Sequence, residues 1–120
     1  MKEVKVYIAS PYTNGDREEN VRFQMGISNR LLDLGFYPFT PLYMHFQHLL
    51  FPRTPEDWLK LDFVWLRQCD CIIRFFTEHN GIKLDSPGAD LEEELARKIG
   101  IPVFYSIEEM VVYYKEKGDI

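Results

Sequence analysis

The chain has 120 residues, of which 46% are hydrophobic and 28% charged, a length and balance that fit one globular domain spanning residues 1–120. The formal net charge is −5, from 14 Lys and Arg against 19 Asp and Glu, and the sequence contains no basic run. A nucleic-acid polymer is therefore disfavoured as the main partner, because binding it requires cations that displace its counterions. We expect the function to reside in a pocket.

The N-terminal residues and the cysteine spacing indicate in which cellular compartment the protein is expected. Residues 1–8 alternate charged and apolar side chains and lack the apolar core of a signal peptide. No stretch approaches the roughly 18 apolar residues of a membrane span. Cys69 and Cys71 are two residues apart, which suits neither a disulfide framework nor a four-ligand zinc site. We therefore expect a cytoplasmic protein with two buried thiols and no membrane partner.

Strands and helices are predicted to alternate along the first half of the chain, because the period of the apolar residues changes several times. Asp16, with Glu19 three residues later, has the pattern of a capping box and predicts a helix start. Gly35 predicts the end of that helix after Leu34. In chain order, we expect a strand over 4–10, a loop over 11–15, a helix over 16–34, a strand over 36–40 and an aromatic, irregular segment over 41–53.

The second half continues the alternation. Thr54 followed by Pro55 and two acids is typical of a helix start. The apolar run over 69–76 is typical of a strand buried on both faces. In chain order, we expect a helix from 54 to 66, a strand over 69–76, a polar loop from 77, a helix from Ser86 to Lys98, a strand over 101–105 and a final helix from 106.

This order of elements predicts a parallel sheet covered by helices, because the helices have the length of crossover connections. In such folds ligands bind beyond the carboxyl ends of the strands, where the strand order reverses. The functional residues are therefore expected in 10–15, in 41–53, and from 77 into the next helix.

Glu92 is the first candidate functional residue. Its helix is predicted to bury a stripe of residues four apart, namely Leu91, Leu95 and Ile99. The two glutamates that follow each precede a cation by four residues, the favourable order for surface ion pairs, in Glu93–Arg97 and Glu94–Lys98. Glu92 precedes Ala96 instead. It is either a functional carboxylate or an acid that the helix dipole favours near the helix start.

Two weaker signals lie nearby. Ser86 and Gly88 offer a hydroxyl and a backbone without Cβ at a helix N-terminus, where a small anion could bind. Equally, Ser86 could only cap the helix and Gly88 only turn the chain. Asp62 falls on the apolar side of the preceding helix, with Trp58 and Trp65, where its pKa would rise and it could act as a general acid. The alternative is a solvated helical Asp62.

Three motifs in order resemble the nucleoside 2-deoxyribosyltransferase superfamily, which includes the 2′-deoxynucleoside 5′-phosphate N-hydrolases. They are Tyr7-Ile8-Ala9-Ser10-Pro11-Tyr12, Asp62-x-x-Trp65-Leu66-x-x-Cys69-Asp70 and Ser86-x-Gly88-x-x-x-Glu92-x-x-x-Ala96. Together they span nearly the whole chain. The resemblance implies a three-layer flavodoxin-like (Rossmann-like) α/β fold, with helices on both faces of a parallel sheet. It also implies cleavage of the N-glycosidic bond between a base and deoxyribose.

The resemblance also implies residue roles. Glu92 matches the nucleophile, Asp62 the acid that handles the base, and Tyr7 the tyrosine near the nucleophile. Ser86 and Gly88 match the 5′-phosphate contacts of the hydrolase branch. The remaining substrate contacts are expected from the loop after the first strand and from the aromatic segment, at Ser10, Pro11, Tyr12, Tyr43 and His45.

The aromatic segment has three interpretations. Its side chains could cover the ligand and stack on the base, or they could pack a subunit interface. His45 and His48 could suggest a metal pair, but no Cys, Asp or Glu lies close enough in sequence to complete it. We expect no metal and no cofactor, since the first strand also lacks the glycine fingerprint of a dinucleotide site. Because members of the superfamily commonly form dimers or larger assemblies, we expect a homo-oligomer.

The sequence departs from the superfamily pattern in two places. Glu93 and Glu94 follow the matched nucleophile, where the family often has an apolar residue and then glycine. The glycine- and arginine-bearing first loop of the hydrolase branch is replaced by residues 10–15, which leaves Arg17 as a substitute for phosphate binding.

Two functions follow from this pattern. The first is an enzyme that cleaves the N-glycosidic bond of a (deoxy)nucleoside or its 5′-monophosphate and transfers the sugar to another base or to water. The second is a module that keeps the pocket and senses a nucleotide without cleaving it, a reading prompted by the run of three glutamates.

Overall fold

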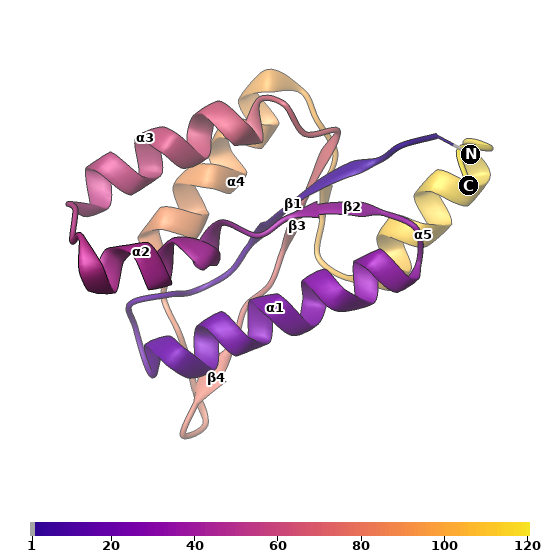
Figure 1. Ribbon diagram of the computed structural model, residues 1–120. Coiled ribbons are helices and arrows are strands. Elements are labelled where there is room, and N and C mark those ends of the chain that lie inside the picture. The colour runs from indigo at the N-terminus through magenta and orange to yellow at the C-terminus, as the bar shows by residue number, and fades with distance from the viewer. Residues whose placement is uncertain (1) are drawn as a thin grey trace.

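The computed structural model describes residues 2–120. Its main sheet has four parallel strands, in the order β2-β1-β3-β6 (Figure 1). They are β1 (Lys5–Ala9), β2 (Tyr37–Phe39), β3 (Cys71–Arg74) and β6 (Val103–Phe104). The central pair runs in register from Val6 opposite Cys71 to Ala9 opposite Arg74. The predicted parallel α/β architecture is confirmed.

Helices cover both faces of this sheet. The α1 (Arg17–Asp33) and α5 (Ile107–Glu116) helices lie on one face, and α3 (Pro55–Leu66) and α4 (Pro87–Ile99) on the other (Figure 1). Side chains of β1 alternate between the two resulting cores: Val6 and Ile8 pack with α1 and α5, whereas Tyr7 and Ala9 pack with α3 and α4. Tyr7 therefore points toward the layer that carries the candidate carboxylates.

The predicted helix starts are confirmed, because each has a side chain that caps it. Asp16 accepts from the Glu19 N–H at 3.1 Å and Thr54 from the Asp57 N–H at 3.1 Å. Ser86 and Ser106 cap α4 and α5 in the same way. At its other end α4 stops at Gly100, whose φ of 80° is the left-handed conformation that favours glycine.

Two segments are more ordered than the sequence predicted. The segment over 41–53 is not irregular: it contains a 3₁₀ turn (Pro41–Tyr43) and the helix α2 (Met44–Leu50). Neither has a capping side chain, so the usual start signal is missing. The loop after β3 contains a hairpin, β4 (Glu78–His79) and β5 (Ile82–Lys83), turned at Asn80 and Gly81. Both turn residues have positive φ, as an Asn-Gly hairpin requires.

The predicted buried stripe of α4 holds at Leu95, which is partly buried and packs against the core, and is wrong at the other two positions. Leu91 and Ile99 are 44% and 41% exposed. The buried residues of α4 are Ala89, Glu92 and Ala96. Two alanines let the helix lie close on the sheet, so the larger apolar residues are displaced to its flanks. As a result Glu92 is on the inner face rather than beside it.

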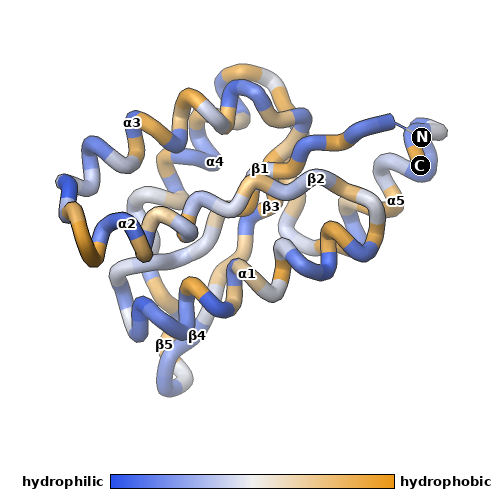
Figure 2. Tube along the Cα trace, in the orientation of Figure 1, coloured by the Kyte–Doolittle hydropathy of each residue, from blue (hydrophilic) through white to orange (hydrophobic). Residues whose placement is uncertain are grey.

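Apolar side chains also gather on the outside of α2 and α3. The C-terminal end of α2 is strongly hydrophobic (Figure 2), although Leu49, Leu50 and Phe51 are each more than 60% exposed. Val64 and Trp65 of α3 are about half exposed. Within residues 2–120, every helix is too short or too polar to span a membrane.

Candidate active site

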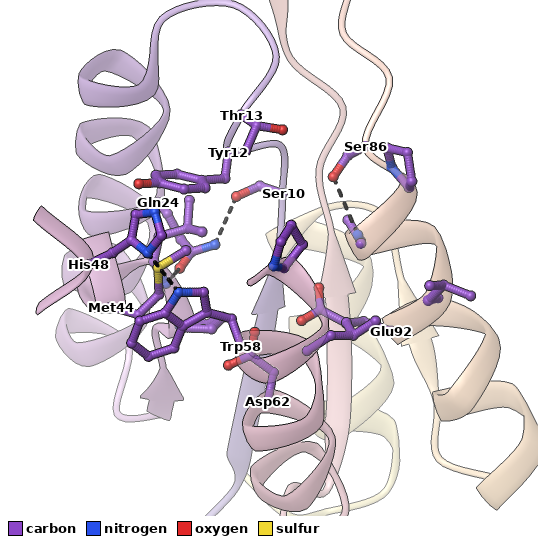
Figure 3. A pocket seen from close by; sticks show the side chains of 18 of the residues that line it. Ser10, Tyr12, Thr13, Gln24, Met44, His48, Trp58, Asp62, Ser86 and Glu92 are labelled. Atoms are coloured by element: carbon purple, nitrogen blue, oxygen red, sulfur yellow. Dashed lines mark hydrogen bonds between the residues drawn. The ribbon is translucent and has the colours of Figure 1, made fainter. Parts of the chain in front are cut away.

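A cavity of about 640 Å³ opens at the carboxyl ends of β1, β2 and β3 (Figure 3). Its walls come from the loop after β1, from α2 and α3, and from the first turns of α4. This is the predicted place, since side chains that follow neighbouring parallel strands meet at one edge of the sheet. The polar residues at the base of the cavity include Ser10, Gln24, Asp62 and Glu92.

Glu92 is held at the inner wall of this cavity. It is only 6% exposed, and its Oε2 accepts a hydrogen bond from the hydroxyl of Tyr7, which is fully buried in the centre of the sheet. The close approach of α4 to the sheet through Ala89 and Ala96 makes this contact possible. The other carboxylate oxygen of Glu92 makes no hydrogen bond to Tyr7 and can face the cavity.

Asp62 approaches Glu92 from α3, and both carboxyl groups point into the same cavity (Figure 3). Each carboxyl shifts the pKa of the other. Burial raises the pKa of each well above its ordinary range, and the charge of Asp62 raises the pKa of Glu92 further. The Tyr7 hydroxyl and the Arg74 guanidinium act in the opposite direction on the pKa of Glu92. The pair therefore holds one proton near neutral pH.

The loop after β1 is fixed by a buried glutamine. Gln24 donates to Oγ of Ser10 at 2.8 Å and to the carbonyl of Ile8 at 3.3 Å, and it accepts from the N–H of Leu42 at 2.9 Å. It thus joins the ends of β1 and β2 across α1. Sequence reasoning missed Gln24, and a lone polar residue on a helix gives no signal of this role.

The remaining predicted contact residues divide into two groups. Ser10, Tyr12, Ser86 and Gly88 line the cavity, as does Arg17. Pro11, Tyr43 and His45 do not. Tyr43 is 51% exposed, and His45 is buried behind Tyr12, with its Nδ1 at 2.6 Å from the Tyr12 hydroxyl.

Aromatic residues that do line the cavity come from α2 and α3. The indole N–H of Trp58 donates to Nδ1 of His48 at 2.9 Å, and both side chains face the cavity (Figure 3). Met44 lies beside them. Sequence reasoning placed Trp58 on the face of Asp62. It assigned the covering role to Tyr43, Met44, His45 and Phe46, and of these only Met44 lines the cavity. Tyr43 ends the 3₁₀ turn before α2 and is exposed, and His45 on α2 is buried against Tyr12. Among residues 2–120, no group of three His, Cys, Asp or Glu side chains is arranged to hold a metal.

Gly88 and Ser86 form the rim at the start of α4. Ser86 caps the helix through the Ala89 N–H at 3.3 Å and also lines the cavity. A Cβ added to Gly88 would meet no atom within 4 Å. Packing therefore does not require glycine at this position.

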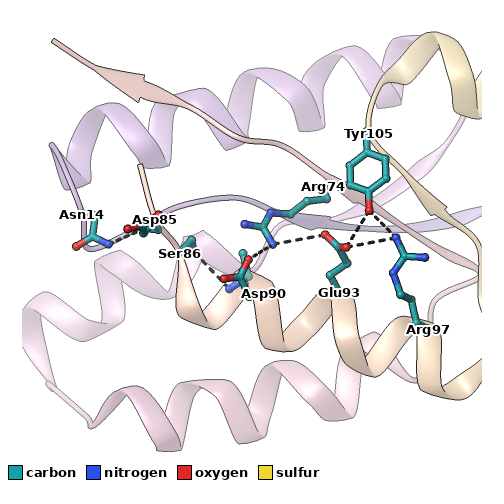
Figure 4. Close-up of polar contacts among 9 residues, drawn as sticks. Asn14, Arg74, Asp85, Ser86, Asp90, Glu93, Arg97 and Tyr105 are labelled. Atoms are coloured by element: carbon teal, nitrogen blue, oxygen red, sulfur yellow. Dashed lines mark hydrogen bonds and ion pairs between the residues drawn. The ribbon is translucent and has the colours of Figure 1, made fainter. Parts of the chain in front are cut away.

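Glu93 points away from the cavity, on the side of α4 next to Glu92. It pairs with Arg97 at 3.3 Å, accepts from the Tyr105 hydroxyl at 2.8 Å and lies 3.6 Å from Arg74 (Figure 4). The predicted Glu93–Arg97 pair is confirmed. No Glu94–Lys98 ion pair occurs within residues 2–120.

Fold and cavity together define the class: a three-layer flavodoxin-like α/β protein with a site at the carboxyl edge of its parallel sheet. The chain belongs to the family described as a domain of unknown function, DUF7768, whose model matches residues 4–106. A search of curated proteins found no match.

One solved structure with a similar fold is a 2-deoxyribosyltransferase from the psychrotolerant bacterium Bacillus psychrosaccharolyticus. The TM-score is 0.59 and the sequence identity 22%, over 83% of this chain and 69% of that chain. At this identity the likeness shows a shared fold, and it confirms the flavodoxin-like architecture expected from the sequence.

Proposed function

We propose that this protein is an enzyme that cleaves the N-glycosidic bond of a (deoxy)nucleoside or its 5′-monophosphate and transfers the sugar to another base or to water. One observation carries the proposal: two carboxyl groups from different helices, Asp62 and Glu92, point into the same cavity, where burial raises the pKa of both. Glycosidic cleavage needs both a carboxylate to stabilise positive charge at the anomeric carbon and an acid to protonate the leaving group.

Glu92 is the proposed nucleophile. Its Oε2 accepts from the Tyr7 hydroxyl, which leaves the other oxygen free to bond to C1′. As that bond forms, the bond between C1′ and the base nitrogen breaks, and its electron pair stays on the base. The proton shared with Asp62 moves to the departing base. In the second step water or a new base attacks C1′, displaces Glu92 and returns a proton to Asp62.

The surroundings favour this division of roles. The Tyr7 hydroxyl and the Arg74 guanidinium both stabilise negative charge on Glu92. Asp62 has no such cationic partner and sits on the same helix as Trp58, which lines the cavity beside it. Burial raises the pKa of both carboxyls, so Glu92 depends on Tyr7 and Arg74 to carry its charge during attack, while Asp62 takes the shared proton and delivers it to the base.

The shape of the cavity suits a nucleoside or its monophosphate. Tyr12 and Trp58 offer aromatic faces on which a base can stack. Ser86, Gly88 and Arg17 line the rim at the start of α4, where a 5′-phosphate could meet the helix N-terminus. The net charge of −5 makes such local cationic and N–H groups necessary for an anionic substrate.

A panel assay tests the proposal. The protein is incubated with nucleosides and 5′-monophosphates, with and without a second base, and products are separated by chromatography. Released base alone indicates a hydrolase, and a new nucleoside indicates a transferase. Glu92→Ala should abolish base release, whereas the surface control Glu94→Ala should retain it. Unchanged turnover in folded Glu92→Ala would refute the assignment.

The alternative function, a sensor that binds a nucleotide without cleaving it, has less support once the contacts of Glu93 are known. The run of three glutamates prompted it, and Glu93 has a structural role of its own with Arg74, Arg97 and Tyr105. Saturable nucleotide binding with no base released by the wild-type protein would nevertheless favour a sensor.

We further propose that the protein acts in the cytoplasm as a homodimer or larger homo-oligomer. The exposed apolar side chains of α2 and α3 would be covered by a second copy, as in subunit interfaces. Leu50 is the most exposed of them, at 75%. Sedimentation should show an assembly that Leu50→Asp weakens, and a monomer at all concentrations would contradict it.

A further inference from the structure

Arg74, the last residue of β3, is a buried cation that does not line the cavity. Only 1% of its side chain is exposed. Taking a guanidinium out of water is costly unless negative charges offset it. Its position opposite Ala9 in the β1–β3 register places it one layer beneath the first turns of α4.

The partners of Arg74 all lie at this end of the sheet. Nη1 is 2.9 Å from Oδ1 of Asp90 and 3.6 Å from Oε1 of Glu93, two residues that stand three apart on α4 (Figure 4). The guanidinium also lies over the ring of Phe76, with Cζ 4.3 Å from the ring centre. Within residues 2–120, neither Nε nor Nη1 of Arg74 has a hydrogen-bond partner, so its contacts with the two carboxylates are ion pairs. The cation is thus paired on one side and only partly satisfied.

Asp90 and Glu93 flank Glu92 on the helix. Residues three apart lie on one face of a helix, and the residue before the second of them points to the neighbouring face. When Arg74 holds Asp90 and Glu93, it fixes the rotation of α4 that turns Glu92 toward Tyr7 and the cavity. The positive charge of the same guanidinium acts to lower the pKa of Glu92.

We propose that Arg74 is a positioning residue for Glu92: from beneath α4 it holds Asp90 and Glu93, fixes the orientation of the carboxylate between them and brings a positive charge near it. This inference rests on the proposed function, since it assigns support of the nucleophile to a residue outside the cavity. It also gives Glu93 a role beside Glu92, because Glu93 and Asp90 are the two carboxylates that Arg74 holds.

The test measures the ionisation of Glu92 directly, without substrate. The charged and titratable groups that face Glu92 are Tyr7 from β1, Asp62 from α3 and Arg74 from β3, with Asp90 and Glu93 on its own helix. The full chain, labelled with ¹³C at glutamate carboxyls, is titrated by NMR, and the Glu92 signal is assigned by its loss in Glu92→Gln.

In Arg74→Met the pKa of Glu92 should rise by about one unit or more, the usual effect of losing a close opposite charge. In Arg74→Lys the pKa of Glu92 should stay close to the wild-type value, because lysine keeps the positive charge. The matched control is Arg97→Met, which also removes a cation from Glu93 but is exposed, and it should leave the Glu92 titration unchanged. Base release by these variants should show its acidic limb moving in parallel with the titration.

Asp90→Asn keeps the test decisive if Arg74→Met does not fold, since the Asp90 side chain is 67% exposed. Removing this competing carboxylate should lower the pKa of Glu92, a shift opposite in sign to that of Arg74→Met. An unchanged or higher pKa of Glu92 in Asp90→Asn would overturn the proposal. So would a folded Arg74→Met with the wild-type titration, or an Arg74→Lys no different from Arg74→Met. A wild-type protein that releases no base would defeat the proposed function and leave these titrations readable.

Discussion

The hydroxyl of Tyr7 donates a hydrogen bond to Oε2 of Glu92 across 85 positions of sequence. Tyr7 is fully buried in the central strand, and Glu92 is on the inner face of α4. The bond therefore ties the sheet to the helix at the wall of the cavity. It also leaves one orientation for the glutamate, with one oxygen held and the other available.

Tyr7→Phe should slow base release about 10–100-fold, as expected when a hydrogen bond to a reacting charged group is lost. Because the Tyr7 hydroxyl favours the charged form of Glu92, its loss should raise the pKa of Glu92, and the acidic limb of the rate profile should move to higher pH. Rates across pH measure both effects. Tyr37→Phe, at an exposed tyrosine of the edge strand, is the control and should behave as wild type.

Asp62→Asn should slow release of ordinary bases by about 10²–10⁴-fold, because an amide cannot donate the proton that the departing base needs. For a nucleoside whose base leaves without protonation, such as an N7-methylated purine, Asp62→Asn should slow base release much less. The ratio of the two rates, measured with purified variant and wild type, isolates proton donation. Equal losses on both substrates would argue against Asp62 as the acid.

Glu92→Gln should stabilise the fold at alkaline pH. Burial raises the pKa of Glu92 in the folded state, so the folded protein holds this proton more tightly than the unfolded chain does. Stability is then highest below the ordinary glutamate pKa of about 4.3 and falls as pH rises through the raised folded-state pKa. The amide removes this penalty.

We expect Tm of Glu92→Gln to exceed that of wild type by roughly 4 °C or more at pH 9, equivalent to about 1 kcal/mol, and to match it at pH 4. Thermal unfolding at the two pH values measures the difference. Glu94→Gln, at an exposed glutamate of the same helix, should show no such dependence. A Glu92→Gln variant that is less stable at pH 9 would contradict the buried, proton-sharing carboxylate.

Gly88→Ala should leave the fold intact, because the added Cβ meets no atom within 4 Å. If the backbone at Gly88 approaches a 5′-phosphate, KM for a 5′-monophosphate should rise about tenfold, worth about 1.4 kcal/mol, with little change for the free nucleoside. Gly26→Ala is a matched control, since Gly26 is also helical with open space around it and lies on α1. It should gain about 0.5–1 kcal/mol of stability and keep both KM values. If Gly88→Ala changes KM equally for both substrates, the 5′-phosphate does not bind at Gly88.

The sequence by itself determined the order of the main strands and helices, because their signals are local. Caps at Asp16, Thr54, Ser86 and Ser106 act over three residues, and the apolar run of β3 reports its own burial. The hairpin at Asn80-Gly81 also has a local signal, because Asn-Gly favours the positive φ angles of a tight hairpin turn. Helix α2 lacked a capping residue and was therefore missed.

Only the tertiary structure decided which residues meet in the cavity. The sequence could mark Glu92 as lacking an ion partner, but its burial follows from the small side chains of Ala89 and Ala96, which set the distance between α4 and the sheet. Gln24 and Arg74 owe their positions to contacts between distant segments, and no spacing in the sequence reports them. Side-chain direction depends on how a helix is rotated against its neighbours, and packing of the whole domain fixes that rotation.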